Sequence, residues 1–131
     1  MEDFRDPDNA IVNMYFENGN LGAIDLSRSG FYGYDIQSEI LGTAGCLRCG
    51  YLRETPIQVM KDNAISHDTV PGFYERFEKA YIDQLFDFFE NVIQDREPSV
   101  TAADGLAALK IGLAATKSYH ENHVVEVKEI E

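Results

Sequence analysis

The chain has 131 residues, of which 44% are hydrophobic and 11% aromatic, and its formal net charge is −12. A chain of this length and composition can bury a core without disulfides or metals, so we expect one folded domain over residues 1–131. The negative charge argues against nucleic acid and anionic membranes as partners, because a field of this sign repels phosphate.

The sequence also lacks the signals of export and membrane insertion. It contains no run of about 18 apolar residues, which a spanning helix would need. Residues 1–9 are polar and acidic and have neither the basic nor the apolar region of a secretory signal. Since Cys46 and Cys49 are the only cysteines, no disulfide framework is expected, and we predict a cytoplasmic protein.

Three pairs of short alternating segments predict β-hairpins in the first half of the chain. The pairs are residues 10–16 with 21–27, 34–41 with 46–51, and 57–61 with 65–69. Asn18-Gly19 lies inside the first pair, and this dipeptide is typical of a type I′ turn. Asp62-Asn63 lies inside the third. Strands joined in this way form antiparallel sheets.

The stretch 31–42, Phe-Tyr-Gly-Tyr-Asp-Ile-Gln-Ser-Glu-Ile-Leu-Gly, organises this half of the chain. Successive side chains of a strand point to opposite faces of the sheet. One face carries Tyr34, Ile36, Ser38 and Ile40, and the other carries Asp35, Gln37, Glu39 and Leu41. The first face suits a core, whereas the polar row suits water or a subunit interface. Gly33 leaves room for another backbone or for a ligand.

The second half of the chain has the three- and four-residue apolar spacing of helices. Residues 73–95 are apolar over so wide an arc that we expect cover on two sides. Thr101 and Asp104 predict a capping box that opens a second helix over residues 102–119. Its small residues Gly105, Ala108, Gly112 and Ala115 form a stripe that indicates a close backbone contact. Residues 124–127 are expected to form a last strand.

These elements predict an α+β fold with a mostly antiparallel open sheet of about six strands and two long helices packed on one face. No predicted helix remains to cover the other face of the sheet. Either water or a second chain must therefore lie against that face.

Cys46 and Cys49 are the first candidates for chemistry. Their spacing is that of a redox pair, but within a strand an offset of three places the thiols on opposite faces. With His120 and His123 they could bind zinc, although two residues between the histidines is a short spacing for that metal. The alternative is two buried thiols and two exposed histidines near a helix end.

Acidic and aromatic side chains supply two further candidates. Asp83, Asp87 and Glu90 share one flank of the long helix and could serve a metal or acid–base chemistry, or could simply be solvated. Tyr34, with Asp35 beside it, could hold a polar substrate at the rim of the sheet, or could only pack. The sequence has no Gly-x-Gly-x-x-Gly, Walker or Gly-x-Ser-x-Gly motif, so no self-contained active site is predicted.

Three stretches point to a known family. They are residues 31–45, which open with Phe-Tyr-Gly-Tyr-Asp, residues 73–89, and residues 98–109, Pro-Ser-Val-Thr-Ala-Ala-Asp-Gly-Leu-Ala-Ala-Leu. Taken together they resemble the C-terminal domain of the Gfo/Idh/MocA oxidoreductases, and most closely the inositol 2-dehydrogenase branch. The resemblance covers residues 9–128 in order and without large gaps.

The resemblance implies a larger enzyme. Members of the family carry an N-terminal Rossmann domain for NAD or NADP, and their C-terminal domain supplies substrate contacts and a homo-oligomer interface through the open face of its sheet. The implied reaction is hydride transfer between a polyol, cyclitol or sugar carbon and the nicotinamide. By this resemblance Tyr34, the second tyrosine of Tyr-Gly-Tyr-Asp, contacts the substrate. No catalytic, cofactor-binding or metal-binding residue of this chain is assigned.

The sequence departs from the family pattern in one large way. It lacks the Rossmann half, the Glu-Lys-Pro motif with its catalytic lysine, and the Asp-x3-His pair that normally precedes the sheet. We therefore expect an NAD(P)-dependent dehydrogenase as the full-length protein and no activity from residues 1–131 alone. Two alternatives remain: a stand-alone, non-catalytic binding or assembly module of the same fold, and a zinc-stabilised domain.

Overall fold

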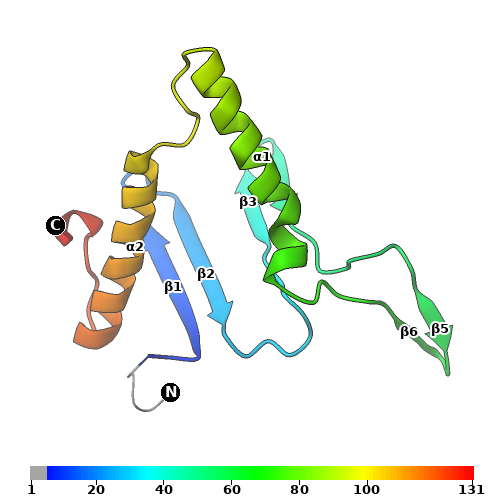
Figure 1. Ribbon diagram of the computed structural model, residues 1–131. Helices are drawn as coiled ribbons and strands as arrows, with labels where there is room; N and C mark the ends of the chain where they lie inside the picture. The colour runs from blue at the N-terminus through cyan, green and yellow to red at the C-terminus, as the bar shows by residue number, and fades with distance from the viewer. Residues whose placement is uncertain (1–5) are drawn as a thin grey trace. The chain divides into compact units, whose positions relative to one another are not determined.

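The computed structural model describes residues 6–131 and confirms the α+β class (Figure 1). Its elements are β1 (Asn9–Tyr15), β2 (Leu21–Ser27), β3 (Ser38–Gly42), β4 (Gly45–Cys49), β5 (Val59–Lys61), β6 (Ala64–Ser66), α1 (Phe73–Ile93), α2 (Ala102–Glu121) and the 3₁₀ helix η2 (Val127–Glu129). The chain divides into two compact units, Met1–Asp83 and Gln84–Glu131, which we describe separately. Neither described helix is long and apolar enough to cross a membrane.

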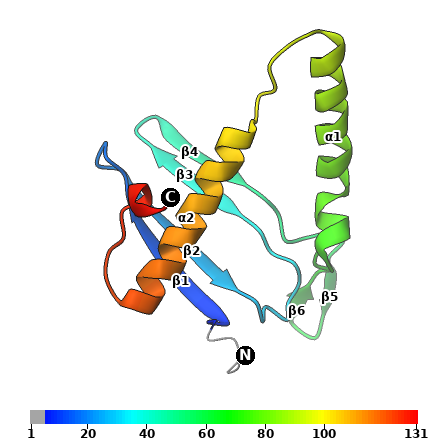
Figure 2. The ribbon, with the colours of Figure 1, turned by 60° about the vertical axis from the view of Figure 1, so that its left-hand side comes forward.

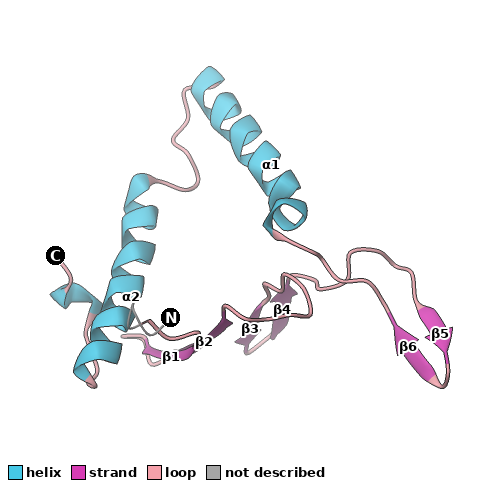
Figure 3. Cartoon of the chain, turned by 60° about the horizontal axis from the view of Figure 1, so that its bottom comes forward, coloured by secondary structure: helices cyan, strands magenta, loops and turns pink. Residues whose placement is uncertain are grey.

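Each predicted pair of strands forms an antiparallel hairpin, as Figure 2 shows for β1 with β2 and for β3 with β4. The hydrogen-bonded ladders differ from the expected single sheet, because they are three separate two-stranded units within residues 6–131 (Figure 3). Two of these hairpins have seven- and five-residue strands, whereas β5 and β6 have three residues each. A single hairpin is only marginally stable in water, so these units need cover from other parts of a protein.

The first hairpin is closed by a different turn from the one predicted. The last ladder pair is Tyr15 with Leu21, which leaves too many residues for a two-residue turn. The Gly19 N–H donates to the Phe16 carbonyl at 2.9 Å, and Gly19 has the positive φ of 85°. Asn18 does not have a positive φ; its side-chain oxygen instead accepts the Asn20 N–H at 3.0 Å. The type I′ prediction for Asn18-Gly19 is therefore wrong.

The type I′ geometry lies at the third hairpin instead. Asp62 and Asn63 have φ values of 54° and 59°, and the flanking Lys61 and Ala64 are the last pair of the ladder. Two successive positive φ values are what a type I′ turn requires. Short polar side chains tolerate this backbone region better than most residues do.

A buried valine joins three segments of the first unit. The Tyr34 N–H donates to the Val70 carbonyl at 2.7 Å, and the Val70 N–H donates to the Leu52 carbonyl at 2.8 Å. Val70 is 1% exposed. A Cβ on Gly33 would lie only 2.7 Å from the Thr69 hydroxyl, so the space beside this glycine holds another backbone segment rather than a ligand. The predicted strand start at Tyr34 is wrong, because β3 begins at Ser38.

The second unit is built on helix α2. The predicted capping box is present, and the Thr101 N–H donates to the Asp104 carboxylate at 2.7 Å. The helix ends at Asn122, a left-handed C-cap whose N–H donates to the Ser118 carbonyl at 2.9 Å. Nothing lies within 4 Å of a Cβ built on Gly105 or Gly112, so this unit makes no close backbone contact at the small-residue stripe.

The predicted strand over residues 124–127 is wrong. The chain there is irregular and then enters η2 (Val127–Glu129). Local side chains take up the backbone carbonyls that a ladder would use: the Ser118 hydroxyl donates to the His123 carbonyl at 2.6 Å, and the His123 ring meets the Val124 carbonyl. With these groups already paired, no neighbouring strand is needed to satisfy them.

Few side chains are buried within the described residues. Val70 is the buried residue of the first unit, and Asn91 and Ala114 are those of the second. Large apolar side chains of α1 stay open to solvent, including Phe86 at 66% exposure and Ile93 at 81%. Contiguous exposed apolar surface of this kind marks sites that meet other protein.

We predict that Gly50→Ala destabilises the protein far more than Gly19→Ala. Both glycines have positive φ, 104° and 85°, so alanine is strained at either position. A Cβ on Gly50 would in addition overlap the Ile36 carbonyl and lie 2.9 Å from Gln37 Cα, whereas nothing lies within 4 Å at Gly19. We expect a loss of about 1 kcal/mol at Gly19 and about 3 kcal/mol at Gly50, measured by urea unfolding. Equal midpoints for the two variants would contradict the close approach at Gly50.

Candidate functional site

Tyr34 lies on the segment that links Gly33 to β3, and its ring is held by the start of α1. The ring is half-buried and meets Phe73 and Phe77 edge-on, with each pair of ring centroids 6.1 Å apart. The Phe73 and Phe77 rings are themselves 5.4 Å apart. Edge-to-face packing of this kind fixes ring orientation. In the part of the chain that the structure describes, the Tyr34 hydroxyl makes no hydrogen bond, so its polar tip is free to bind.

The polar row beside Tyr34 is tied up in two local pairs. The Gln37 side-chain amide donates to Asp35 at 2.7 Å. On the hairpin itself, the Arg48 Nε–H donates to Glu39 at 2.7 Å across the ladder. The Arg48 and Glu39 side chains are 70% and 49% exposed, and ion pairs this open to water contribute little to stability. The row is therefore a solvated face in this structure, available to a partner.

Arg76 and Tyr51 belong to the same neighbourhood, although sequence analysis did not single them out. Arg76 Nη2 donates to the Ile36 carbonyl at 2.9 Å, and the guanidinium carbon lies 4.4 Å from the centroid of the Tyr51 ring. The sequence held a signal, because Arg76 lies between Phe73 and Phe77, two apolar positions of the expected helix, and the structure shows that the arginine is half-buried. Arginine in such a position usually has a specific partner.

The two cysteines are exposed and free, which corrects the expectation of buried thiols. Cys46 pairs with Leu41 and Cys49 with Ser38, residues on opposite faces of β3, so the two thiols also lie on opposite faces. Within residues 6–131 no three His, Cys, Asp or Glu side chains are grouped so that they could hold a metal ion. The redox hypothesis therefore has no support from this hairpin, and the same placement disfavours any metal site that uses both thiols.

The acidic flank of α1 also has separate local partners. Asp83 forms an ion pair with Lys79, Asp87 accepts a hydrogen bond from the Asn91 amide at 3.0 Å, and Glu90 lies 3.9 Å from Arg96. Each of the three carboxylates therefore has its own partner, and they do not share one. This arrangement favours the solvated-face interpretation of the three residues.

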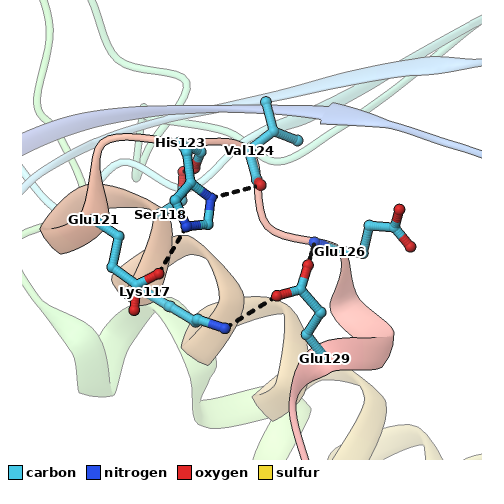
Figure 4. Close-up of polar contacts among 7 residues, drawn as sticks. All are labelled: Lys117, Ser118, Glu121, His123, Val124, Glu126 and Glu129. Atoms are coloured by element: carbon cyan, nitrogen blue, oxygen red, sulfur yellow. Dashed lines mark hydrogen bonds and ion pairs between the residues drawn. The ribbon is translucent and has the colours of Figure 1, made fainter.

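His123 sits at the centre of the polar contacts that close the second unit (Figure 4). Its Nδ1 lies 2.8 Å from the Val124 carbonyl and its Nε2 lies 2.8 Å from Glu121. Lys117 and Glu129 form a neighbouring pair at 3.0 Å, which ties η2 to α2. Because both ring nitrogens face acceptors, the Val124 carbonyl first and then Glu121 raise the pKa of His123.

We predict that the contacts of His123 at the end of α2 lose stability as the pH rises. The pKa of His123 is higher in the folded chain than its ordinary value of 6.5, so the stabilisation is complete below pH 6.5 and is lost as pH rises through the folded pKa. Titration of the His123 ring followed by NMR should give a raised pKa, and Glu121→Gln should lower it part of the way, since the Val124 carbonyl remains. A pKa that does not respond to Glu121→Gln would contradict the pairing.

Comparison with known proteins places this geometry in context. Residues 1–127 match the profile of the oxidoreductase family, C-terminal alpha/beta domain. The chain is 35% identical over 97% of its length to the scyllo-inositol 2-dehydrogenase (NAD(+)) of Bacillus subtilis, of which it covers 37%. It is also 35% identical to the myo-inositol 2-dehydrogenase of Thermotoga maritima, over 95% of this chain and 38% of that one. The chain thus spans less than two fifths of the length of these relatives.

Solved structures agree with the sequence relatives. A probable dehydrogenase from Thermotoga maritima has a TM-score of 0.86 at 34% identity, over 95% of this chain and 38% of that one. The scyllo-inositol dehydrogenase of Lactobacillus casei, solved with bound NAD(H) and scyllo-inositol, has a TM-score of 0.84 at 28% identity, over 90% of this chain and 35% of that one. From the family match and these relatives, the chain belongs to the Gfo/Idh/MocA oxidoreductases and corresponds to their C-terminal α/β domain.

Proposed function

We propose that this chain is the substrate-binding and oligomerisation domain of an NAD(P)-dependent oxidoreductase that acts on a polyol, cyclitol or sugar. The observation that carries the proposal is the identity of 35% over nearly the whole chain to an enzyme named for scyllo-inositol oxidation. In this proposal the domain is inactive by itself, because the hydride acceptor is held by another domain.

Tyr34 is the residue proposed to contact the substrate. Two phenylalanines fix its ring, and among the described residues its hydroxyl has no partner. A phenol can both donate and accept a hydrogen bond, which suits the hydroxyl groups of a cyclitol. Its preorganised position would reduce the entropy lost when a polyol binds.

The described residues do not form a dinucleotide site of the usual kind. Such a site joins a parallel strand to a helix through a glycine-rich loop, and the pyrophosphate lies on the helix N-terminus. All three strand pairs here are antiparallel, and α1 follows Pro71-Gly72 rather than a strand. We therefore assign NAD or NADP to a part of the enzyme outside residues 6–131 and no residue of this chain to cofactor binding.

Exposed apolar side chains support the oligomerisation role. Leu41 is 82% exposed and lies on the same face of β3 as Glu39, and its ladder partner Cys46 is also exposed. Uncovered sheet faces with apolar side chains are typical of subunit interfaces. We propose that a second copy of the enzyme covers this face, with the Asp35, Gln37 and Glu39 row in or near the contact.

A chimera tests the catalytic part of the proposal. The matching C-terminal region of the Bacillus subtilis relative is replaced by this chain, and NADH formation is followed at 340 nm with scyllo- and myo-inositol. We expect turnover from the chimera and none from this chain alone. Tyr34→Phe should raise the KM for the cyclitol roughly fivefold to tenfold, because one hydrogen bond is lost. Tyr32→Phe, which alters an exposed tyrosine two residues away, is the matched control.

The opposite result has a defined meaning. A chimera that folds and quenches or enhances NADH fluorescence, yet oxidises no cyclitol, polyol or sugar, would reject the dehydrogenase proposal. It would favour the non-catalytic binding or assembly module instead. If turnover occurs and Tyr34→Phe has the same KM as Tyr32→Phe, the dehydrogenase proposal is supported and the substrate contact of Tyr34 is rejected.

Sedimentation velocity tests the oligomerisation part. We expect this chain to sediment as a species of more than one copy, and Leu41→Asp to shift it toward the monomer, because a carboxylate would be desolvated at the interface. Tyr74→Asp is the matched control, since Tyr74 is 81% exposed and lies on α1 rather than on the sheet face. A wild-type chain that stays monomeric at high concentration would reject this interface.

A further inference from the structure

The segment that carries Tyr34 is not held by a β ladder. Residues 34–37 lie between Gly33 and the first residue of β3, and no strand within residues 6–131 pairs with them. The Tyr34 N–H is fixed by the Val70 carbonyl at 2.7 Å. Two residues further on, the Ile36 carbonyl also lies outside the β3–β4 ladder and takes its hydrogen bond from elsewhere in the chain.

Arg76 supplies that partner. Its Nη2 donates to the Ile36 carbonyl at 2.9 Å, while its guanidinium stacks on Tyr51 at 4.4 Å and lies 5.8 Å from the Phe77 centroid. Among residues 6–131 it forms no ion pair, and its Nε is buried without a hydrogen-bond partner. This arginine is thus placed for a backbone oxygen and an aromatic face, and not for a carboxylate.

The backbone of Gly50 lies close to this carbonyl. Gly50 has a φ of 104°, and a Cβ on it would overlap the Ile36 carbonyl and lie 2.9 Å from Gln37 Cα. Gly50 therefore presses against residues 36–37 without donating a hydrogen bond to them. The Ile36 carbonyl is confined by Gly50 and held by Arg76.

We propose that Arg76 is the positioning residue of Tyr34, an inference that rests on the proposed substrate contact of that tyrosine. Helix α1 holds the tyrosine at two points: Phe73 and Phe77 hold its ring, and Arg76 holds the backbone two residues later. Without Arg76 the backbone of residues 34–37 would keep the Tyr34–Val70 hydrogen bond but lose the one at Ile36, so it would be held at one end instead of two. The hydroxyl at the end of the ring would then lose its fixed position.

The test uses the full chain labelled with 3-fluorotyrosine, in which Tyr34→Phe identifies the Tyr34 resonance. We expect Arg76→Met to shift or broaden that resonance and to speed hydrogen exchange of the Tyr34 amide by roughly tenfold or more. Lys79→Met is the matched control, because it removes the same charge from an exposed side chain one turn along α1. It should leave both signals unchanged.

Arg76→Lys separates the hydrogen bond from the planar stack. Lysine keeps the charge and a donor but loses the stacking on Tyr51, so we expect an intermediate rate of Tyr34 amide exchange. If Arg76→Met does not fold, this variant decides alone, and an exchange rate equal to wild type overturns the proposal. In a folded Arg76→Met chain, an unchanged Tyr34 resonance and amide also overturn it.

Kinetics of the chimera supply the second readout. Arg76→Met should raise the KM for the cyclitol about tenfold and leave the KM for NAD unchanged, because a displaced binding group weakens only its own ligand. Equal changes in both constants would mean general damage and would overturn the positioning role. If the wild-type chimera has no activity, the proposed function fails, and the fluorine and exchange measurements still decide whether Arg76 positions Tyr34.

Discussion

The first unit of this protein depends on the backbone pairing of Val70 with two segments distant in sequence. Its carbonyl accepts the Tyr34 N–H and its N–H donates to the Leu52 carbonyl, and the side chain between them is almost fully buried. In an apolar environment such hydrogen bonds are costly to leave unmade, so the three segments hold one another in register. Thr55 and Asp68 continue the contact toward the β5–β6 hairpin, with the Thr55 N–H 3.1 Å from the carboxylate.

This pairing explains why Tyr34 has a defined position although it lies outside any ladder. Its backbone is fixed from one side by Val70, and its ring is fixed by two phenylalanines of α1. Because the ring is already fixed, little conformational entropy would be lost when a ligand binds to the hydroxyl of this tyrosine. Membership of the Gfo/Idh/MocA oxidoreductases makes a polyol hydroxyl the natural ligand to propose for it.

The second unit is stabilised by contacts of another kind. Asp104 caps the start of α2, and after Asn122 the chain turns back so that Lys117 meets Glu129 and His123 meets Glu121. These contacts join residues that are close along the chain and exposed to solvent, so each adds only modest stability. The aromatic side chains of α1, such as Phe86 and Phe89, are exposed. Burial of one such side chain against another protein surface would contribute about 1.5–3 kcal/mol of stabilisation, which is more than any of these polar contacts adds.

The sequence by itself determined the features that depend on neighbours in the chain. Alternation located the three hairpins, the apolar period located both helices, and Thr101 with Asp104 located the start of α2. The motif around Tyr34 and two further stretches carried the resemblance to the family that the profile match confirms. Local rules sufficed here because a turn of helix or a pair of strands is specified by a few adjacent residues.

Only the tertiary structure decided how distant backbone groups are paired. It placed the start of β3 at Ser38, because Val70 and Arg76 take the hydrogen bonds that a longer strand would have used. It also replaced the expected last strand by η2, since Ser118 and His123 engage the carbonyls there. The start of β3 is not visible in a window of sequence, because Val70 and Arg76 lie far along the chain from the backbone groups that they bind. The loss of the last strand depends on Ser118 and His123, which lie just outside the segment where the strand was expected.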